Sequence, residues 1–251
     1  MRLLGAMGLA LVLVLAGGAA SARADVLVKD GETVAFLGDS ITAGGMGPKG
    51  YVRLVESGLK VAGVNIKVIG AGVGGHKSND MLKREDKDVI SKNPQWMTIS
   101  CGVNDVWHGS NGVPLDKYKT NMTEIVDKAQ KAGIKVMILT ATMIGEDQPN
   151  ANNQKLVAYN DFLRELAKEK KCPLADLNAD MQAGVAELKK TTPKGNVMTA
   201  DGVHMNGAGN KMMATGILRA FGLDEAQMAK VKSSWEESAG TKPAATNEGK
   251  K

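Results

Sequence analysis

Short, predominantly apolar runs alternate with amphipathic stretches along most of this chain, from about residue 33 to residue 222. The apolar runs are four to seven residues long, as expected of strands that are buried on both faces of a sheet. Between them, apolar side chains recur at three- and four-residue spacing, which is typical of helices with one buried face. Because strands and helices alternate this regularly, we expect right-handed crossovers and a parallel sheet between two helical layers, a three-layer α/β/α sandwich.

The limits of these elements follow from the same pattern and from the glycines and prolines that interrupt it. The predicted strands cover residues 34–37, 66–69, 96–101, 135–141 and 173–177. The predicted helices cover residues 51–62, 78–91, 114–132, 156–166 and 181–188, and two more helices follow a loop that contains Pro193 and Gly195. The polar segment 142–153 contains Pro149 and is expected to be a surface loop over the same sheet edge. The length suits one domain with a sizeable core.

Residues 1–24 have the pattern of a signal peptide. An initial Met-Arg pair precedes an apolar stretch over residues 3–20, and the following Ala-Arg-Ala at 22–24 supplies the small residues that a signal peptidase recognises. Glycines interrupt the stretch and no basic cluster follows it, which disfavours a membrane anchor. We therefore expect cleavage and export to the periplasm or the medium, one globular domain over residues 25–235, and a disordered tail over residues 236–251.

Composition and charge limit the kinds of molecule that we expect this protein to bind. The chain is 43% hydrophobic and 24% charged, as ordinary globular proteins are. Loss of Arg2 and Arg23 with the signal peptide would reduce 32 basic residues to 30 against 27 acidic ones, and charges of both signs are interspersed. Since no basic stripe is present, we expect no nucleic-acid partner. Cys101 and Cys172 lie at opposite ends of different predicted strands, so we expect two buried free thiols rather than a disulfide.

Four blocks rich in glycine and polar residues carry the candidate chemistry. They are GDSIT at residues 38–42, GAGVGG at 70–75, GVND at 102–105 and DGVH at 201–204. The first three follow parallel strands, whose carboxyl ends meet at the edge of the sheet where α/β proteins bind their ligands. Ser40 is therefore a candidate nucleophile. Alone, a Gly-Asp-Ser tripeptide more often uses its serine to cap the following helix.

Acyl transfer through a serine needs a base, a group that orients the base, and donors for the developing oxyanion. Asp201 and His204 are three residues apart, so the carboxylate can reach imidazole Nδ1 and leave Nε2 facing Ser40. The backbone N–H of Ser40, the N–H of a glycine in the second block and the side-chain amide of Asn104 could supply the donors. Together, the blocks favour a serine hydrolase.

The four blocks, in this order, resemble the SGNH or GDSL hydrolase family of serine esterases and lipases over roughly residues 33–222. The resemblance implies a flavodoxin-like, five-stranded parallel sheet with strand order 2-1-3-4-5. It also implies that Ser40 is the nucleophile, His204 the base and Asp201 its partner. The oxyanion would be bound by Ser40, Gly75 and Asn104.

The second block departs from the common family pattern. The family often has Asn-Ala-Gly before the turn and a small polar or acidic residue after the key glycine, whereas this chain has Gly70 and His76 there. The choice between Gly74 and Gly75 as donor therefore stays open. The block also satisfies the dinucleotide-binding G-x-G-x-x-G, but the acidic residue after the next strand, Asp105, lies about thirty residues on, so we expect no cofactor.

Other polar residues near the blocks are assigned no chemistry. The three histidines have neither H-x-x-x-H nor Cys-His spacing, so we expect no metal site. Asp39 and Asp105 are expected to bond nearby backbone amides. His76 and His108 should line the edge of the loops, where His108 either contacts substrate or is an ordinary solvated histidine.

The sequence therefore predicts an exported serine esterase that removes small acyl groups, such as acetyl, from a carbohydrate or another polar carrier. Trp107, His108 and Met143 are predicted to line the substrate site. One alternative is a lysophospholipase or thioesterase. An alternative of another class is an exported binding module that keeps the fold and lacks catalysis, which the presence of Ser40, Asn104 and His204 disfavours.

Overall fold

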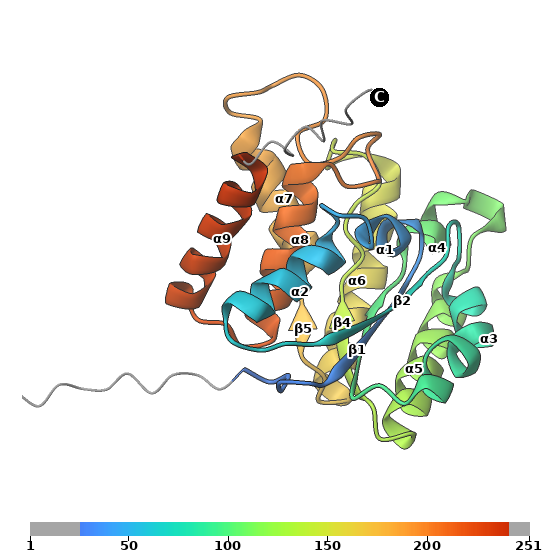
Figure 1. The fold of residues 1–251 in the computed structure, drawn as a ribbon. Coiled ribbons are helices and arrows are strands. Elements are labelled where there is room, and N and C mark those ends of the chain that lie inside the picture. The colour runs from blue at the N-terminus through green and yellow to red at the C-terminus, as the bar shows by residue number, and fades with distance from the viewer. Residues whose placement is uncertain (1–25, 241–251) are drawn as a thin grey trace, which may run out of the picture.

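A parallel five-stranded sheet with the order β2-β1-β3-β4-β5 forms the centre of the molecule (Figure 1). Its strands are β1 (Thr33–Gly38), β2 (Lys67–Gly72), β3 (Trp96–Ser100), β4 (Lys135–Leu139) and β5 (Leu174–Ala175). The computed structural model describes residues 26–240, so the predicted signal peptide and residues 241–251 lie outside the described part of the chain. The predicted fold class and strand order are confirmed.

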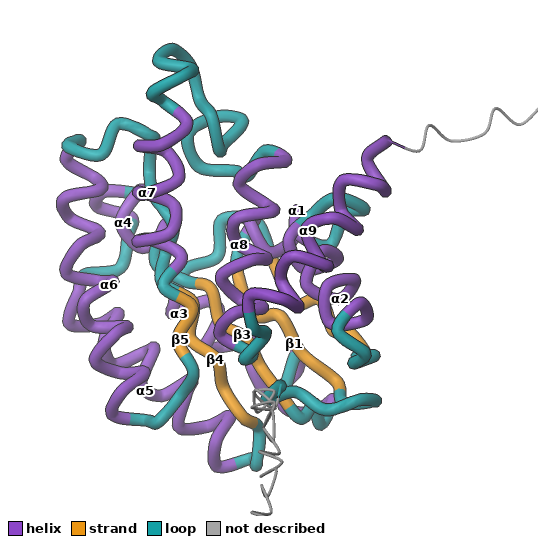
Figure 2. The backbone as a smooth tube through the Cα atoms, turned by 90° about the vertical axis from the view of Figure 1, so that its left-hand side faces the viewer, coloured by secondary structure: helices purple, strands orange, loops and turns teal. Residues whose placement is uncertain are grey.

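Helices cover both faces of this sheet, as Figures 1 and 2 show. One layer contains α3 (Ser78–Asp88), α5 (Leu115–Lys131) and α6 (Ala151–Glu169), and the other contains α2 (Tyr51–Val61), α8 (Gly207–Ala220) and α9 (Glu225–Gly240). The remaining helices are α1 (Ser40–Gly45), α4 (Val103–Trp107) and α7 (Leu177–Leu188), with 3₁₀ turns at Ile90–Lys92 and Gly109–Asn111.

The end of α9 differs from the sequence-based expectation. This helix runs to Gly240, into the stretch for which the sequence predicts a disordered tail.

Within residues 26–240, no helix combines the length and the apolar character that a bilayer crossing requires.

The core contains the side chains that the apolar spacing predicts. Residues 34–37 of β1 are fully buried, and so are Tyr51, Val55 and Leu59 on one face of α2. A large apolar side chain that is buried in this way contributes about 1.5–3 kcal/mol to folding. The apolar faces of the helices pack against the sheet. The polar loops therefore lie at the carboxyl edge of the strands.

Strand β2 is longer than predicted, because the first half of the glycine-rich block continues the strand. Residues 70–72 pair with residues 36–38 of β1. A Cβ atom on Gly72 would lie 2.3 Å from the backbone nitrogen of Ala43, and one on Gly70 would lie 2.9 Å from the side chain of Met46. These two glycines let α1 and the residue after it pack on β2, so their spacing has a packing cause.

Both cysteine thiols are free, as predicted. Cys101 is buried, but Cys172 is only half-buried. The expectation that both would be buried is therefore met only for Cys101, because Cys172 lies in the short connection between α6 and the edge strand β5.

A fully buried carboxyl group, Glu85, lies where α3 packs against α5. Within residues 26–240, neither carboxyl oxygen has a hydrogen-bond partner, and the ammonium group of Lys128 is 3.7 Å away. Burial raises the pKa of Glu85 to about 8, and Lys128 offsets only part of this effect. Between pH 4.5 and 8, the folded state therefore holds this proton more tightly than the unfolded state does.

We expect Glu85→Gln to remove this pH dependence. Wild-type stability should fall as pH rises from 4.5 to 8, by up to about 1.4 kcal/mol per pH unit from this group, and then level off. The glutamine variant should match the wild type near pH 4.5 and exceed it at pH 8. Urea unfolding of both proteins across this range measures the difference. The exposed Glu187→Gln serves as the control, and an identical pH slope for Glu85→Gln and wild type would disprove the assignment.

Candidate active site

Ser40 lies at the carboxyl end of β1 as the first residue of α1. The carboxylate of Asp39, which is buried, accepts a hydrogen bond from the backbone N–H of Ile41 at 2.9 Å and so caps this helix. The capping role that the sequence leaves open for Ser40 thus belongs to Asp39. The hydroxyl of Ser40 is left free to contact residues from other segments.

A hydrogen-bonded chain joins Ser40 to the fourth block. Nε2 of His204 is 2.9 Å from Oγ of Ser40, and Nδ1 of His204 is 2.7 Å from Oδ2 of Asp201. The other oxygen of Asp201 accepts the backbone N–H groups of Val203 and His204 at 2.9 and 2.8 Å. The structure thus brings together the three residues on which the hydrolase interpretation depends, across 164 residues of chain.

The charge of Asp201 determines how the imidazole is protonated. Hydrogen bonds from the His204 side chain and backbone, together with that from Val203, lower the pKa of Asp201 to about 2. The carboxylate is therefore ionised at neutral pH and holds the Nδ1–H tautomer, which leaves the Nε2 lone pair directed at the Ser40 hydroxyl. An imidazole held in this way can accept the proton of the serine.

The helix after His204, α8, begins with a side-chain cap at Asn206. Oδ1 of Asn206 accepts the N–H groups of Ala208 and Gly209 at 2.9 and 3.1 Å. Asn210 accepts the backbone N–H of Tyr51 at 2.8 Å and so joins the start of α8 to the start of α2. These contacts anchor the carboxyl side of the segment that carries the imidazole.

Backbone N–H groups of Ser40 and of the second block are available as donors. Within residues 26–240, neither the N–H of Ser40 nor the N–H of Gly75 donates a hydrogen bond to the protein. Gly75 has φ +73°, a conformation that favours glycine, whereas a Cβ on Gly74 would lie 4.0 Å from the Cβ of Ser40. The N–H of Gly74 likewise donates no hydrogen bond within the described residues, so the choice between Gly74 and Gly75 stays a prediction.

Asn104 is buried in α4 and has its amide group fully occupied. Its Nδ2 donates to Oδ2 of Asp39 at 3.2 Å and to the carbonyl oxygen of His76 at 3.1 Å, while Oδ1 contacts Nε2 of His108 at 3.1 Å. Because the amide has two hydrogens and both are engaged, Asn104 can reach an oxyanion only by giving up or sharing one of these bonds.

Arg84, which sequence analysis missed, ties the second block to the sheet. Its guanidinium group donates to the carbonyl oxygens of Gly38 and Ala71 at 2.7 and 2.8 Å, and to Nδ1 of His76 at 3.0 Å. Burial and the nearby Arg84 lower the pKa of His76, which accordingly accepts this bond as a neutral ring. Arg84 lies in a run of mixed charges, and nothing in the sequence separates it from the solvated residues around it.

The residues predicted to line the substrate site fall into two groups. Trp107 is 45% exposed at the end of α4, and His108 follows it and contacts Asn104. Met143 is fully buried in a cluster with Met181, Val185 and Met198, so the prediction that it lines the site is wrong. The segment that contains Met143 runs from β4 toward α7. Its side chain therefore packs inward, against Met181 and Val185 of that helix.

The predicted structural aspartates bond neighbouring segments. Oδ1 of Asp105 accepts both the backbone N–H and the hydroxyl of Ser78, at 3.0 and 2.6 Å, and thereby joins α4 to α3. Within residues 26–240, no group of three or more histidine, cysteine, aspartate or glutamate side chains is arranged to hold a metal ion.

Ser40 and the residues bonded to it lie at an open edge of the molecule. The side chains of His204 and Asp201 are 40% and 53% exposed. Four cavities of about 310, 470, 520 and 560 Å³ in the described part of the chain are lined by none of the three hydrogen-bonded residues. A bulky carrier can therefore approach this edge from solvent.

Several proteins that are similar to this chain in sequence or structure are named as esterases. An acetylxylan esterase of Geobacillus stearothermophilus is 27% identical over 217 residues, which cover 78% of this chain and 97% of that protein. Esterase TesA of Pseudomonas aeruginosa is 27% identical over 175 residues, covering 69% and 79%. The crystal structure of an acetyl xylan esterase, AlAXEase, has a TM-score of 0.71 and 36% identity, covering 75% of this chain and 98% of that chain.

The region that matches a known family contains the four blocks and all of the sheet except the first three residues of β1. Residues 36–212 match the GDSL-like Lipase/Acylhydrolase family. This range begins in β1, just before the nucleophile candidate, and ends in α8, after the histidine. The chain therefore belongs to the GDSL-like lipase/acylhydrolase family of ester hydrolases.

Proposed function

We propose that this protein is an exported serine esterase that removes acetyl groups from a carbohydrate carrier through an acyl-enzyme intermediate. The observation that carries the proposal is the 2.9 Å approach of His204 Nε2 to Ser40 Oγ, with Asp201 behind the imidazole at 2.7 Å. A serine, a base and a group that orients the base are the parts that nucleophilic acyl transfer requires.

The chemistry starts with a proton transfer. His204 Nε2 takes the proton of Ser40 as Oγ attacks the carbonyl carbon of the ester. The imidazolium, stabilised by the Asp201 carboxylate, then gives this proton to the alcohol oxygen as the carbon–oxygen bond breaks and acetyl-Ser40 forms. In the second half, His204 takes a proton from a water molecule as the water oxygen attacks the acetyl carbon. The imidazolium then returns this proton to Oγ of Ser40 as the acyl bond breaks, and acetic acid leaves and ionises to acetate.

The N–H groups of Ser40 and Gly75 are proposed to bind the oxyanion that forms in both halves. One donor of this kind typically contributes about 10²–10³ in kcat. Asn104 is proposed as a third donor, and it would give up its bond to the His76 carbonyl oxygen to act. Asp39 would retain the second hydrogen of the amide and so keep the side chain in place.

The preference for a small acyl group on a large polar carrier rests on two observations. The open edge at Ser40 suits a polymer that lies across the surface, and the two acetylxylan esterases named above act, by their names, on an acetylated polysaccharide. The exposed ring of Trp107 offers an apolar face on which a sugar ring could stack. Export rests on the signal-peptide pattern of residues 1–24 and would bring the enzyme to polysaccharide outside the cell.

An acyl-chain series tests the substrate preference. We expect p-nitrophenyl acetate to have a higher kcat/KM than the butyrate and octanoate esters, and we expect acetate release from acetylated xylan. The Ser40→Ala variant gives the background rate for every substrate. Activity that peaks at octanoate or longer chains would instead favour the alternative, a lysophospholipase or thioesterase.

A further inference from the structure

The segment that carries Asp201 and His204 is bonded to a buried carboxylate on another loop. This segment, here called the His204 loop, comprises residues 197–206. The side chain of Glu146 is 5% exposed, and its two oxygens accept four hydrogen bonds from the start of the loop. The donors are the backbone N–H groups of Val197, Met198 and Thr199 and the hydroxyl of Thr199, all at 2.7 or 2.8 Å.

These bonds hold a carboxylate rather than a carboxylic acid. Burial by itself raises the pKa of Glu146, but the hydrogen bonds from Val197, Thr199 and Met198 outweigh burial, and the pKa is below its ordinary value. Charge-assisted bonds of this kind are shorter and stronger than neutral ones. Without the carboxylate, three backbone N–H groups would lie near the protein interior with no acceptor, which is costly.

The bonds to Glu146 are important for the His204 loop because the end of the loop that carries Asp201 and His204 is open to solvent. Beyond Thr199, the loop closes as a narrow hairpin, with the N–H of Ala200 bonded to the carbonyl oxygen of His204 at 2.8 Å. The hydroxyl of Thr199 also accepts a hydrogen bond from the N–H of Gly202 at 3.1 Å. The Thr199 side chain therefore connects Glu146 to the turn that contains Gly202. The backbone of Gly145 adds a bond to Gly202 at 2.7 Å.

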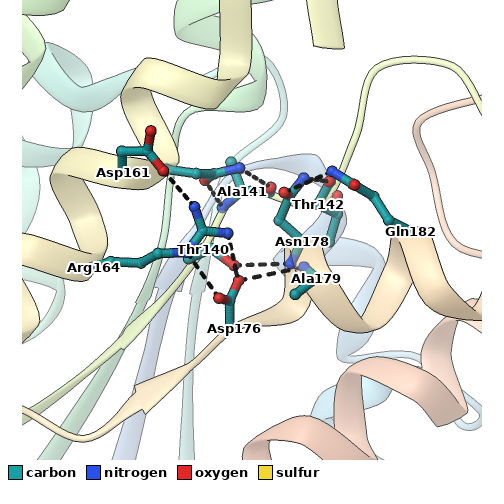
Figure 3. A network of polar contacts seen from close by, with 10 residues as sticks. Thr140, Ala141, Thr142, Asp161, Arg164, Asp176, Asn178, Ala179 and Gln182 are labelled. Carbon is teal, nitrogen blue, oxygen red and sulfur yellow. Dashed lines mark hydrogen bonds and ion pairs between the residues drawn. The ribbon is translucent and has the colours of Figure 1, made fainter. Parts of the chain in front are cut away.

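Glu146 can act as an anchor because the chain that leads to it is itself fixed. Residues 140–146 leave β4 as an arm, and Figure 3 shows the polar network at its start. Arg164 forms a two-bond ion pair with Asp176 at 2.8 and 3.0 Å, and Asp176 accepts the hydroxyl of Thr140. Nδ2 of Asn178 donates to the carbonyl oxygen of Thr142 at 2.6 Å.

The other residues of the arm are held in the same manner. Both the N–H and the carbonyl oxygen of Ala141 are bonded to the side-chain amide of Asn160. Asn153 accepts the N–H of Ile144 at 2.8 Å and donates to the carbonyl oxygen of Gly145 at 2.9 Å. The arm therefore has side-chain bonds at nearly every residue before Glu146, although it contains no regular secondary structure.

We propose that Glu146 is a positioning residue that sets the place of His204 relative to Ser40, by holding the stem of the His204 loop on the rigid arm after β4. The inference rests on the proposed function, in which the imidazole must meet the serine hydroxyl within hydrogen-bond distance. A displacement of about 1 Å between reacting groups can lower a rate by about 100-fold. Loss of Glu146 should therefore lower kcat without removing any substrate contact.

Glu146→Gln is the first test. Gln keeps the size of the side chain, but its NH₂ group faces backbone donors, so at least one bond is lost and one repulsive contact is gained. We expect kcat for p-nitrophenyl acetate to fall by about 10- to 100-fold with KM nearly unchanged. We also expect loss of the low-field proton resonance of the His204 Nδ1–H, which reports the bond to Asp201. The neighbouring exposed Asp147→Asn is the matched control and should retain both.

A second pair of variants keeps the test decisive if Glu146→Gln fails to fold. Thr199→Val removes the hydroxyl that joins Glu146 to Gly202, and Thr199→Ser retains it, so only the valine variant should lose kcat. Wild-type kcat in folded Glu146→Gln, or a loss of kcat that only matches the fraction unfolded, would overturn the inference. So would equal kcat for the two Thr199 variants. Equal hydrolysis by wild type and Ser40→Ala would defeat the proposed function instead, and the resonance would still test Glu146.

Discussion

Replacing Ser40 by alanine should lower kcat for acetyl-ester hydrolysis by about 10⁴-fold or more, because no other atom in the arrangement can form the acyl-enzyme. The melting temperature should stay close to that of the wild type. Ser40 is only partly buried, and the cap of α1 is Asp39, so removal of the hydroxyl leaves packing and helix capping intact.

Acetate release and thermal unfolding, measured on the same preparation, check both parts of this result. Ser91→Ala, which removes an exposed hydroxyl far along the chain, is the control for the purification and the assay. A Ser40→Ala variant that is folded and hydrolyses the ester at the wild-type rate would rule out a serine nucleophile at this position.

Replacing His204 by alanine should reduce kcat by a similarly large factor, about 10³- to 10⁶-fold, since the serine loses its base. The double variant Ser40→Ala/His204→Ala should be no slower than Ser40→Ala alone, because the two groups act as one unit. The His204 side chain is 40% exposed, so imidazole added to the buffer can enter the space and restore part of the rate.

Rates for the two single variants and the double variant form a cycle that measures the coupling directly. Additive losses, in which the double variant is slower than either single variant by the product of both factors, would contradict the shared proton transfer. Lack of rescue by imidazole in a folded His204→Ala protein would speak against a base role.

The sequence predicts the centre of the sheet well because β1, β3 and β4 are buried on both faces over nearly all of their length. Residues 34–37 and 136–139 are continuous in apolar side chains, β1 ends at Gly38, and Gly102 follows shortly after β3. Once a parallel sheet is inferred, the carboxyl ends of its strands share an edge. This topology brings the first three blocks together, but the block with His204 follows no strand, so its approach to Ser40 is expected only from the resemblance to the hydrolase family.

Side-chain contacts between loops could not be predicted in the same way. The segment 142–153 reads as a polar surface loop, yet Glu146 is buried in it and bonds residues more than fifty positions away. Arg84 has no feature in the sequence that distinguishes it from Lys83 or Lys87. Hydrogen bonds of this kind leave no periodic trace, because each depends on one pair of positions.

For Met143 and two glycines of the second block, the sequence predicts a place in the fold that differs from the observed one. Met143 stands next to a predicted strand end and was therefore assigned to the site, but its side chain packs inward against Met181. Gly70 and Gly72 look like turn residues, whereas they lie in β2 because α1 and Met46 need the space of their missing side chains. A close approach of two segments is visible only in three dimensions.

Covalent trapping of the nucleophile tests the central claim most directly. Diisopropyl fluorophosphate labels serines that an adjacent base activates, and the modified peptide can be identified by mass spectrometry after digestion. The account predicts one labelled peptide containing Ser40 in the wild type, in step with loss of esterase activity, and no labelling of His204→Ala on the same timescale. Complete labelling of a different residue, or full esterase activity with Ser40 modified, would contradict it.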